Sequence, residues 1–257
     1  LRIQKVYRHV FRMANFSALI HVSDEDRSEV HFLTEELLSK LNDHPFKPRS
    51  EDVVQIFYEE IRQKPKILVP TESISYQTSV SIKGPLFYEN PSLFASYYVL
   101  TSLVHSEFLY PLLYDKFSIA TIQSNFDPIY GITTFSSTKD KNPPQVINTI
   151  EESISTIYRK QIDNDIVENV IINIIANLDA PISPSEEGNE NFIYNLPLNQ
   201  KLLLRQAILN VTAKDVKYGA YVMSYSPKRY VIHGPNQDAM IPQGFELFDI
   251  NDNIDEN

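Results

Sequence analysis

The chain has 257 residues, no cysteine and six glycines, and its 23 basic and 33 acidic side chains give a formal net charge of −10. Without cysteine it can form no disulfide, thiolate zinc site or thiol nucleophile, and a chain of this length can bury a sizeable core without such links. Because no two glycines lie close together, glycine-rich phosphate loops are excluded. The excess of acidic side chains argues against nucleic acid or an anionic membrane as partners.

The first quarter of the chain is predicted to contain helices and one strand. Ser23 is expected to cap a helix, because its hydroxyl can accept from a free backbone N–H and three acidic residues follow it in the first turn. By apolar periodicity we expect the end of a helix in residues 3–10, a strand over 16–22, a helix from Ser23 through residue 41, and a second amphipathic helix over 54–61.

The middle of the chain predicts four strands around one buried helix. Residues 67–69 form a short apolar run, and residues 76–82 alternate apolar and polar, which is typical of a strand with one buried face. The helix expected over about residues 91–109 is apolar on nearly all sides and should therefore be buried. Residues 117–126 and 129–137 predict two paired strands on either side of Asp127 and Pro128.

The last part of the chain is predicted to be mainly helical, with a short strand near its end. Asp163 or Asp165 is expected to cap a helix, and Thr212 and Asp215 stand at the spacing of a capping box. We expect helices over residues 146–157, 165–178, 198–209 and 212–223, a strand over 229–233, and a frayed acidic tail over 246–257. The order of elements predicts an α+β fold, with residues 1–257 as one two-layer domain in which helices pack on a mainly antiparallel or mixed sheet.

No complete catalytic site is visible in the sequence. No histidine has another four residues later, so the zinc motifs that place two histidines on one helix face are missing. His31 and Glu35 share a helix face without a third ligand, and an ordinary surface pair is the favoured reading. His105, Ser106 and Glu107 are adjacent and point in different directions on a helix, so they cannot form a triad by themselves. Taken alone, these residues indicate a soluble acidic domain.

The fifteen tyrosines are the enrichment that stands out, because the chain has no tryptophan. Four of them lie in or next to the apolar helix: Tyr97, Tyr98, Tyr110 and Tyr114. Packing of the rings in the core with the hydroxyl at the surface is the favoured interpretation. A peptide-binding surface is the alternative.

The segment from about Lys66 to Lys217 resembles the insulinase/pitrilysin class of zinc metallopeptidases, and most of all its presequence-protease and falcilysin-like subfamily. The strongest match is the apolar run 170–178, which leads into Asp179-Ala-Pro-Ile-Ser-Pro184 and then Gly188. Weaker matches follow in the family's order: Val69-Pro70-Thr71, Tyr76, Phe135-Ser-Ser-Thr-Lys-Asp140, Arg205, Ile208-Leu209, Thr212 and Asp215.

This resemblance implies the place of the chain in a larger protein. Members of the class consist of four similar α+β domains that enclose a peptide chamber, and their zinc motif lies in the first domain. The chain resembles the fourth domain. The resemblance therefore implies peptide substrates and N-terminal sister domains as partners, with zinc held in the N-terminal half of the parent and no cofactor in this fragment. Such a fragment would not show a targeting signal, so no location is predicted.

The segment Tyr114 to Thr121 departs from the family pattern. Active members carry an Arg and a Gly-Gly-Ala-Tyr-Gly run here, which hold the substrate near the zinc-bound water. By register, Tyr114 replaces the Arg and Ala120 replaces the Tyr, while Lys116 retains a positive charge nearby. These three residues are expected to face the chamber. The resemblance thus implies a non-catalytic C-terminal domain; a degenerate pseudopeptidase or a scaffold domain without proteolytic role is the alternative.

Overall fold

The structure is a computed structural model of the chain, and it describes residues 18–40, 65–116, 119, 121–128, 130–189, 198–236 and 241–248. The chain divides into two compact units. Unit 1 comprises residues 1–59 and 181–197, and unit 2 comprises residues 60–180 and 198–257. Each unit is described by itself. The prediction that residues 1–257 form one domain stays a prediction.

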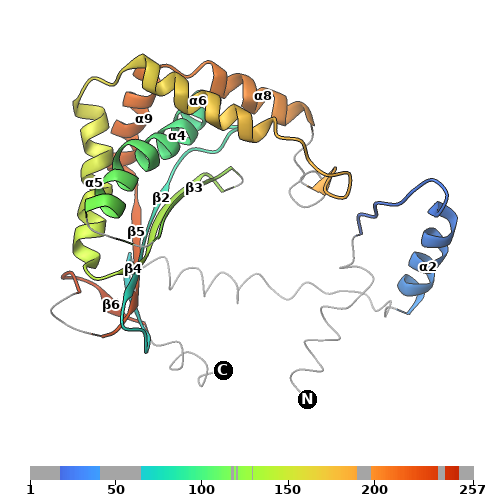
Figure 1. Cartoon of the computed structure of the whole chain (residues 1–257), viewed down its shortest axis with the longest axis horizontal. Coiled ribbons are helices and arrows are strands. Elements are labelled where there is room, and N and C mark those ends of the chain that lie inside the picture. Colours follow the sequence, from blue (N-terminus) through green and yellow to red (C-terminus); the bar gives the residue numbers. More distant parts are fainter. Residues whose placement is uncertain are drawn as a thin grey trace. The chain divides into compact units, whose positions relative to one another are not determined.

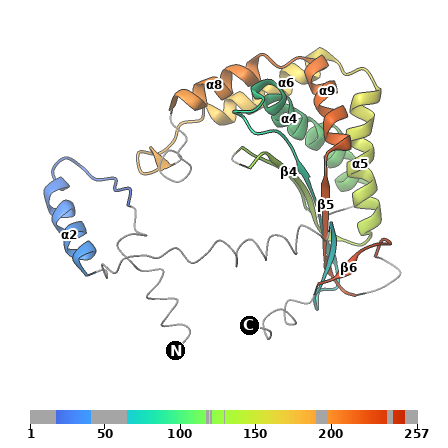
Figure 2. The same cartoon turned by 180° about the vertical axis from the view of Figure 1, so that it is seen from behind.

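Unit 2 is built on a mixed sheet of six strands in the order β3-β4-β2-β5-β1-β6 (Figures 1 and 2). Strands β3, β4, β2 and β5 pair in antiparallel fashion, whereas β1 runs parallel to both β5 and β6. The last long strand, β5, therefore lies between the first two. The strands are β1 (Lys66–Pro70), β2 (Tyr76–Lys83), β3 (Thr121–Asp127), β4 (Ile132–Asp140), β5 (Lys228–Gly234) and β6 (Glu246–Leu247).

Helices cover one face of this sheet (Figure 1). The N-termini of four of these helices are capped by a side chain that accepts a hydrogen bond from a free backbone N–H: Asn90, Asn142, Asp163 and Thr212. Thr212 and Asp215 form the predicted capping box. Of the two predicted alternatives Asp163 and Asp165, Asp163 is the residue that caps α6. The helices are α4 (Pro91–Val104), η2 (His105–Lys116), α5 (Pro143–Arg159), α6 (Asn164–Leu178), α8 (Leu198–Leu209) and α9 (Ala213–Tyr225).

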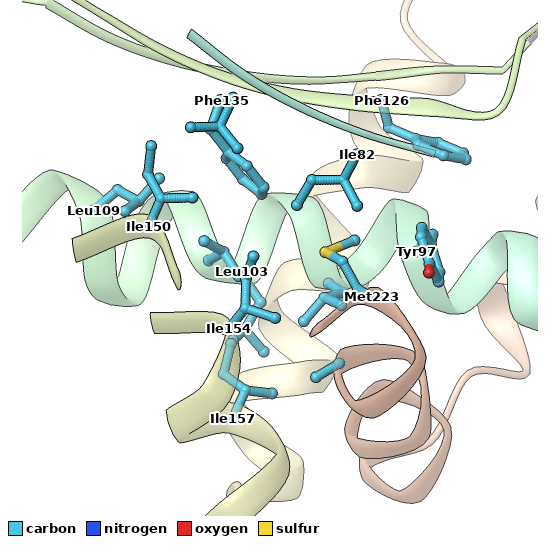
Figure 3. Packing of buried hydrophobic residues seen from close by; sticks show 14 of the residues in the cluster. Ile82, Tyr97, Leu103, Leu109, Phe126, Phe135, Ile150, Ile154, Ile157 and Met223 are labelled. Carbon is cyan, nitrogen blue, oxygen red and sulfur yellow. The ribbon is translucent and has the colours of Figure 1, made fainter. Parts of the chain in front are cut away.

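The core lies between the sheet and these helices (Figure 3). The inward side chains of the strands, such as Ile82 and Phe135, meet the central helix α4, whose Tyr97 and Leu103 are fully buried. Ile154 of α5 and Met223 of α9 fill the space on the far side of α4. The prediction that residues 91–109 are buried because they are apolar on nearly all sides is confirmed for α4.

The central helix continues past its predicted end. After Val104 it widens into η2, a π-helix that contains Pro111 and ends at Lys116. A proline normally ends an α-helix, because it lacks a backbone N–H and its ring clashes with the preceding turn. The wider turn accommodates Pro111, so the helical segment runs on to Lys116. The next strand therefore begins at Thr121 and not at residue 117 as predicted.

In unit 1 the structure describes one helix, α2 (Arg27–Ser39). The helix is confirmed, but its N-cap is Asp26, and the Ser23 hydroxyl donates to the Asp26 carboxylate at 2.7 Å. The predicted strand over residues 16–22 is wrong for residues 18–22, which form no strand. The alternation of apolar residues there is too short to specify a strand without a sheet partner. The helices expected in residues 3–10 and 54–61 lie outside the described residues.

Candidate functional site

The face of the sheet opposite the helices carries a regular array of polar side chains on strands β3, β4 and β2. Because residues that pair directly across antiparallel strands lie on the same face, the register places three of these side chains in each row. We call the nine residues the polar grid; its rows are Thr121, Thr138 and Gln77, then Gln123, Ser136 and Ser79, then Asn125, Thr134 and Ser81.

All nine residues of the polar grid are uncharged, and all are exposed or half-buried. Their hydroxyl and amide groups can donate and accept hydrogen bonds. Within the third row, the Ser81 and Thr134 hydroxyls lie 3.3 Å apart and share a hydrogen bond. The inward neighbours on β2 and β4 are buried, so the polar side chains belong to the surface and not to a core network.

A pair of exposed aromatic rings projects from η2, which packs beside β3. Tyr110 and Tyr114 stack with ring centroids 5.0 Å apart and planes 11° from parallel. Nearly half of each side chain is exposed, 47% for Tyr110 and 46% for Tyr114. The two rings lie one helical turn apart, so the stacking holds them as one rigid aromatic surface.

His105 connects η2 to strand β3. Its Nδ1 lies 3.1 Å from the Ser124 hydroxyl, and its ring centroid lies 6.4 Å from that of Tyr110. Burial lowers the pKa of His105, which favours the neutral imidazole at neutral pH. The neighbouring Ser106 donates to Glu107 at 3.2 Å instead of to His105. The adjacent His-Ser-Glu residues thus form no catalytic triad.

Of the three residues expected to face a chamber, the structure describes the side chain of Tyr114. Its ring is exposed, at the position where the resemblance expects a guanidinium. The side chain of Lys116 and all of Ala120 lie outside the described part of the chain. A chamber-facing role for the three residues stays a prediction.

The described residues do not fit a metal. Among them there is no group of three or more His, Asp or Glu side chains that could hold an ion. His31 Nε2 and Glu35 Oε1 lie 3.6 Å apart on the exposed surface of α2 as an isolated pair. The described ranges therefore contain no ligand set for zinc. The resemblance assigns zinc to another part of a parent protein. No helix in these ranges is both long and apolar enough to span a bilayer.

A pocket of about 340 Å³ opens between α5, the end of α9 and the start of β5. Its rim carries two acidic and two basic side chains, which balance in charge: Glu151, Glu152, Arg159 and Lys228. Glu151 accepts a hydrogen bond of 2.5 Å from the Tyr230 hydroxyl. Burial, together with this hydrogen bond, raises the pKa of Tyr230. The lining of the pocket thus carries no excess of either charge, and the hydrogen bond between Tyr230 and Glu151 links strand β5 to helix α5.

A buried carboxylate ends strand β4. Asp140 is 1% exposed and pairs with Tyr76 of β2, and its Oδ2 accepts a hydrogen bond of 2.5 Å from the Ser137 hydroxyl. Burial raises the pKa of Asp140 despite this hydrogen bond. The residue before it, Lys139, has a φ of 58°, a left-handed conformation that is uncommon outside glycine. This strand end belongs to the segment on which the family resemblance rested.

The model of the PreP C-terminal domain family matches residues 66–231 of the chain. Mitochondrial presequence protease of Emericella nidulans is 27% identical over 152 residues, which cover 58% of this chain and 14% of that protein. The corresponding protein of Aspergillus fumigatus is 25% identical over 193 residues, which cover 67% of this chain and 17% of that protein. The chain thus spans a small part of the length of the relatives that it matches.

Solved structures share the fold. The crystal structure of pitrilysin superposes with a TM-score of 0.58 at 10% identity and covers 89% of this chain and 25% of its own. A protease from Helicobacter pylori has a TM-score of 0.57 at 13% identity, covering 83% of this chain and 53% of its own. A peptidase M16 inactive domain from Pseudomonas fluorescens has a TM-score of 0.52 at 13% identity, covering 87% and 52%. At these identities the likeness establishes the fold alone.

Proposed function

Because the chain belongs to the PreP C-terminal domain family, we propose that it is a non-catalytic C-terminal domain of an insulinase-type zinc metallopeptidase whose polar grid forms part of the wall of a peptide chamber. The observation that carries the proposal is the polar grid itself. Helices cover the other face of the sheet (Figure 2), whereas the strand register places nine uncharged hydrogen-bonding side chains on this face.

The chemistry of the polar grid suits peptides of varied sequence. A peptide in an extended conformation offers backbone N–H and C=O groups whatever its side chains are. Hydroxyl and amide side chains can pair with either group, and each such bond contributes only about 0.5–1.5 kcal/mol net. Nine neutral groups therefore favour weak, sequence-tolerant contact, and Arg229 of β5, which pairs with Ser81, places a positive charge at the border of the grid. That is the behaviour expected of a chamber wall.

The tyrosine pair beside β3 supports a role without direct part in the reaction. The resemblance expects a guanidinium at Tyr114 to reach the substrate near the metal, and removal of one preorganised donor to an oxyanion typically costs about 10²–10³ in rate. A phenol bears no positive charge at neutral pH, and Tyr114 is stacked on Tyr110. We therefore assign to Tyr114 contact with the peptide, and we expect Lys116 and Ala120 on the same side.

Zinc analysis and a cleavage assay test the non-catalytic assignment. Purified chain should contain no stoichiometric zinc and should leave an internally quenched fluorogenic peptide intact. Zinc at one equivalent, together with turnover that a chelator abolishes, would overturn the assignment.

Site-specific photocrosslinking tests whether the polar grid contacts a peptide. A benzophenone amino acid at Ser136, in the centre of the polar grid, should crosslink to a fluorescent unstructured peptide. The same group at Gln206, an exposed position on α8, serves as the matched control and should not. Equal labelling at both positions, or none at Ser136, would contradict the wall and favour a scaffold role without peptide contact.

A further inference from the structure

Helix α9 has an exposed face of unusual composition. Every exposed side chain of this helix is a lysine or a tyrosine. Tyr218, Tyr221 and Tyr225 are exposed to 59%, 51% and 72%. The five positions follow the three-to-four residue spacing of one helix face. We call this set the Lys–Tyr stripe: Lys214, Lys217, Tyr218, Tyr221 and Tyr225.

Folding alone does not account for the Lys–Tyr stripe. The opposite face of α9, with Val216, Ala220 and Met223, already supplies the core contacts. Lysine near the N-terminus of a helix is slightly unfavourable, because the free N–H groups there carry partial positive charge. Lys214 stands in the first turn of α9 and Lys217 follows one turn later. Large exposed rings are likewise more common at interfaces than on free surfaces.

Two residues of helix α5, Tyr158 and Arg159, lie next to the Lys–Tyr stripe and continue its surface. Tyr158 meets Tyr221 edge to face with centroids 6.1 Å apart, and Tyr221 lies 5.1 Å from Tyr225. The Arg159 guanidinium lies 5.4 Å from the Tyr158 ring centroid, and its Nε donates to the Tyr158 hydroxyl at 3.2 Å. The contacts fix three rings and one cation as a continuous surface on two packed helices. Tyrosine and arginine, together with tryptophan, are the residues most often found to dominate binding energy at protein interfaces.

The charge of this surface is opposite to that of the chain. The chain carries a net charge of −10, yet the exposed charges of the stripe, Lys214 and Lys217, are both positive, and Arg159 adds a third. Complementary charge steers a partner to its site and excludes partners of like charge. We infer that the Lys–Tyr stripe binds an acidic polypeptide segment that also carries apolar side chains. This site lies on the helical layer and is separate from the polar grid.

The surroundings define the orientation of the bound segment. The pocket beside the end of α9 carries Glu151 and Glu152 together with Arg159 and Lys228, so its charges balance. The excess of positive charge therefore lies at the start of α9, where Lys214 and Lys217 attract acids. The acidic side chains of the partner therefore lie over the first half of α9, and its apolar side chains lie over Tyr221 and Tyr225.

Other polyanions fit this surface less well. Nucleic acids and anionic bilayers are bound through many phosphate contacts. The stripe offers two lysines on a chain whose overall charge repels an extended polyanion. A short acidic segment needs few ion pairs and gains the rest from contact with the rings.

Fluorescence anisotropy with the full chain tests the inference. The probe is a labelled synthetic peptide of alternating Glu and Leu, compared with the same peptide carrying Lys in place of Glu. We expect binding of the acidic peptide alone, weakened by salt. The variant Lys214→Glu/Lys217→Glu should lower its affinity about tenfold, and Tyr221→Ala/Tyr225→Ala should do the same through lost ring contact.

A matched variant separates the stripe from the overall charge. Lys83→Glu/Lys141→Glu makes the same change in net charge at two exposed positions outside α9, and it should alter the affinity by less than about twofold. Far-UV circular dichroism verifies that each variant is folded. Equal binding of both peptides, equal loss in the control variant, or preferential binding of phosphatidylserine vesicles or single-stranded DNA would each overturn the inference.

Discussion

Replacement of Gly84 by alanine should destabilise the protein mainly because of a buried ring. A Cβ added at Gly84 would lie 2.6 Å from Cδ1 and 2.7 Å from Cε1 of Tyr97. The ring cannot move aside easily, because Tyr97 is fully buried and its hydroxyl lies 3.0 Å from that of Ser226. Overpacking of this kind costs about 1–3 kcal/mol. The backbone at Gly84 does not have positive φ, so the ring and not the backbone conformation opposes the methyl group.

A double-mutant cycle isolates this effect. Tyr97→Ala alone should cost about 3–5 kcal/mol through loss of a buried ring. With the ring removed, Gly84→Ala should cost clearly less. The contact that remains is with the Gly131 carbonyl oxygen, 3.1 Å from the added Cβ, and the restriction of the unfolded chain by alanine offsets it by up to about 1 kcal/mol. Urea unfolding followed by circular dichroism at 222 nm measures each variant, and the chain has no tryptophan whose fluorescence could serve. If Gly84→Ala costs the same with and without the ring, the steric explanation is wrong.

Three further predictions concern single polar groups. Burial raises the pKa of Asp140, so the stability contributed by its protonated form is full below about pH 4 and is lost as pH rises through the raised pKa. Asp140→Asn should therefore flatten the dependence of the unfolding free energy on pH above about 4. An unchanged slope in urea titrations from acid to neutral pH would contradict this. Thr212→Ala should cost about 0.5–2 kcal/mol in urea unfolding, because it removes the hydroxyl that caps α9 with Asp215, whereas Thr212→Ser should retain most of the stability. Tyr230→Phe should remove a late step from an alkaline absorbance titration at 295 nm, because burial and the hydrogen bond to Glu151 raise the pKa of the Tyr230 phenol; persistence of that step would refute the assignment.

Much of unit 2 could be predicted from the sequence because its local signals agree with its tertiary structure. The alternation in residues 76–82 became the buried and exposed faces of β2, and the Thr212–Asp215 spacing became a capping box. The α+β class is confirmed. Helix η2 was not predictable, because the wider turn that accommodates Pro111 depends on packing against α4, α5 and β3 and leaves no local signal.

The candidate site was less visible in the sequence. Gln77, Ser79 and Ser81 were recognised only as the polar half of an alternating strand. The polar grid arises when β4 and β3 add their own polar residues in register. The residues of β2 lie 44 to 61 positions before their row partners on β3 and β4, so they cannot be aligned without the strand pairing. In the same way, the stacking of Tyr110 on Tyr114 depends on the geometry of η2.

The position of β5 between β2 and β1 has a consequence for synthesis of the protein. Lys66 pairs with Tyr230 and Val69 with His233, so β1 obtains its inner partner only when residues 228–234 have left the ribosome. Until then the hairpin of β3 and β4 can join β2, but β1 has no strand that connects it to them. Contacts between such distant segments are slow to form. A nascent chain that stops before Lys228 would expose the edges of both β1 and β2, which makes it a candidate for aggregation or for capture by chaperones.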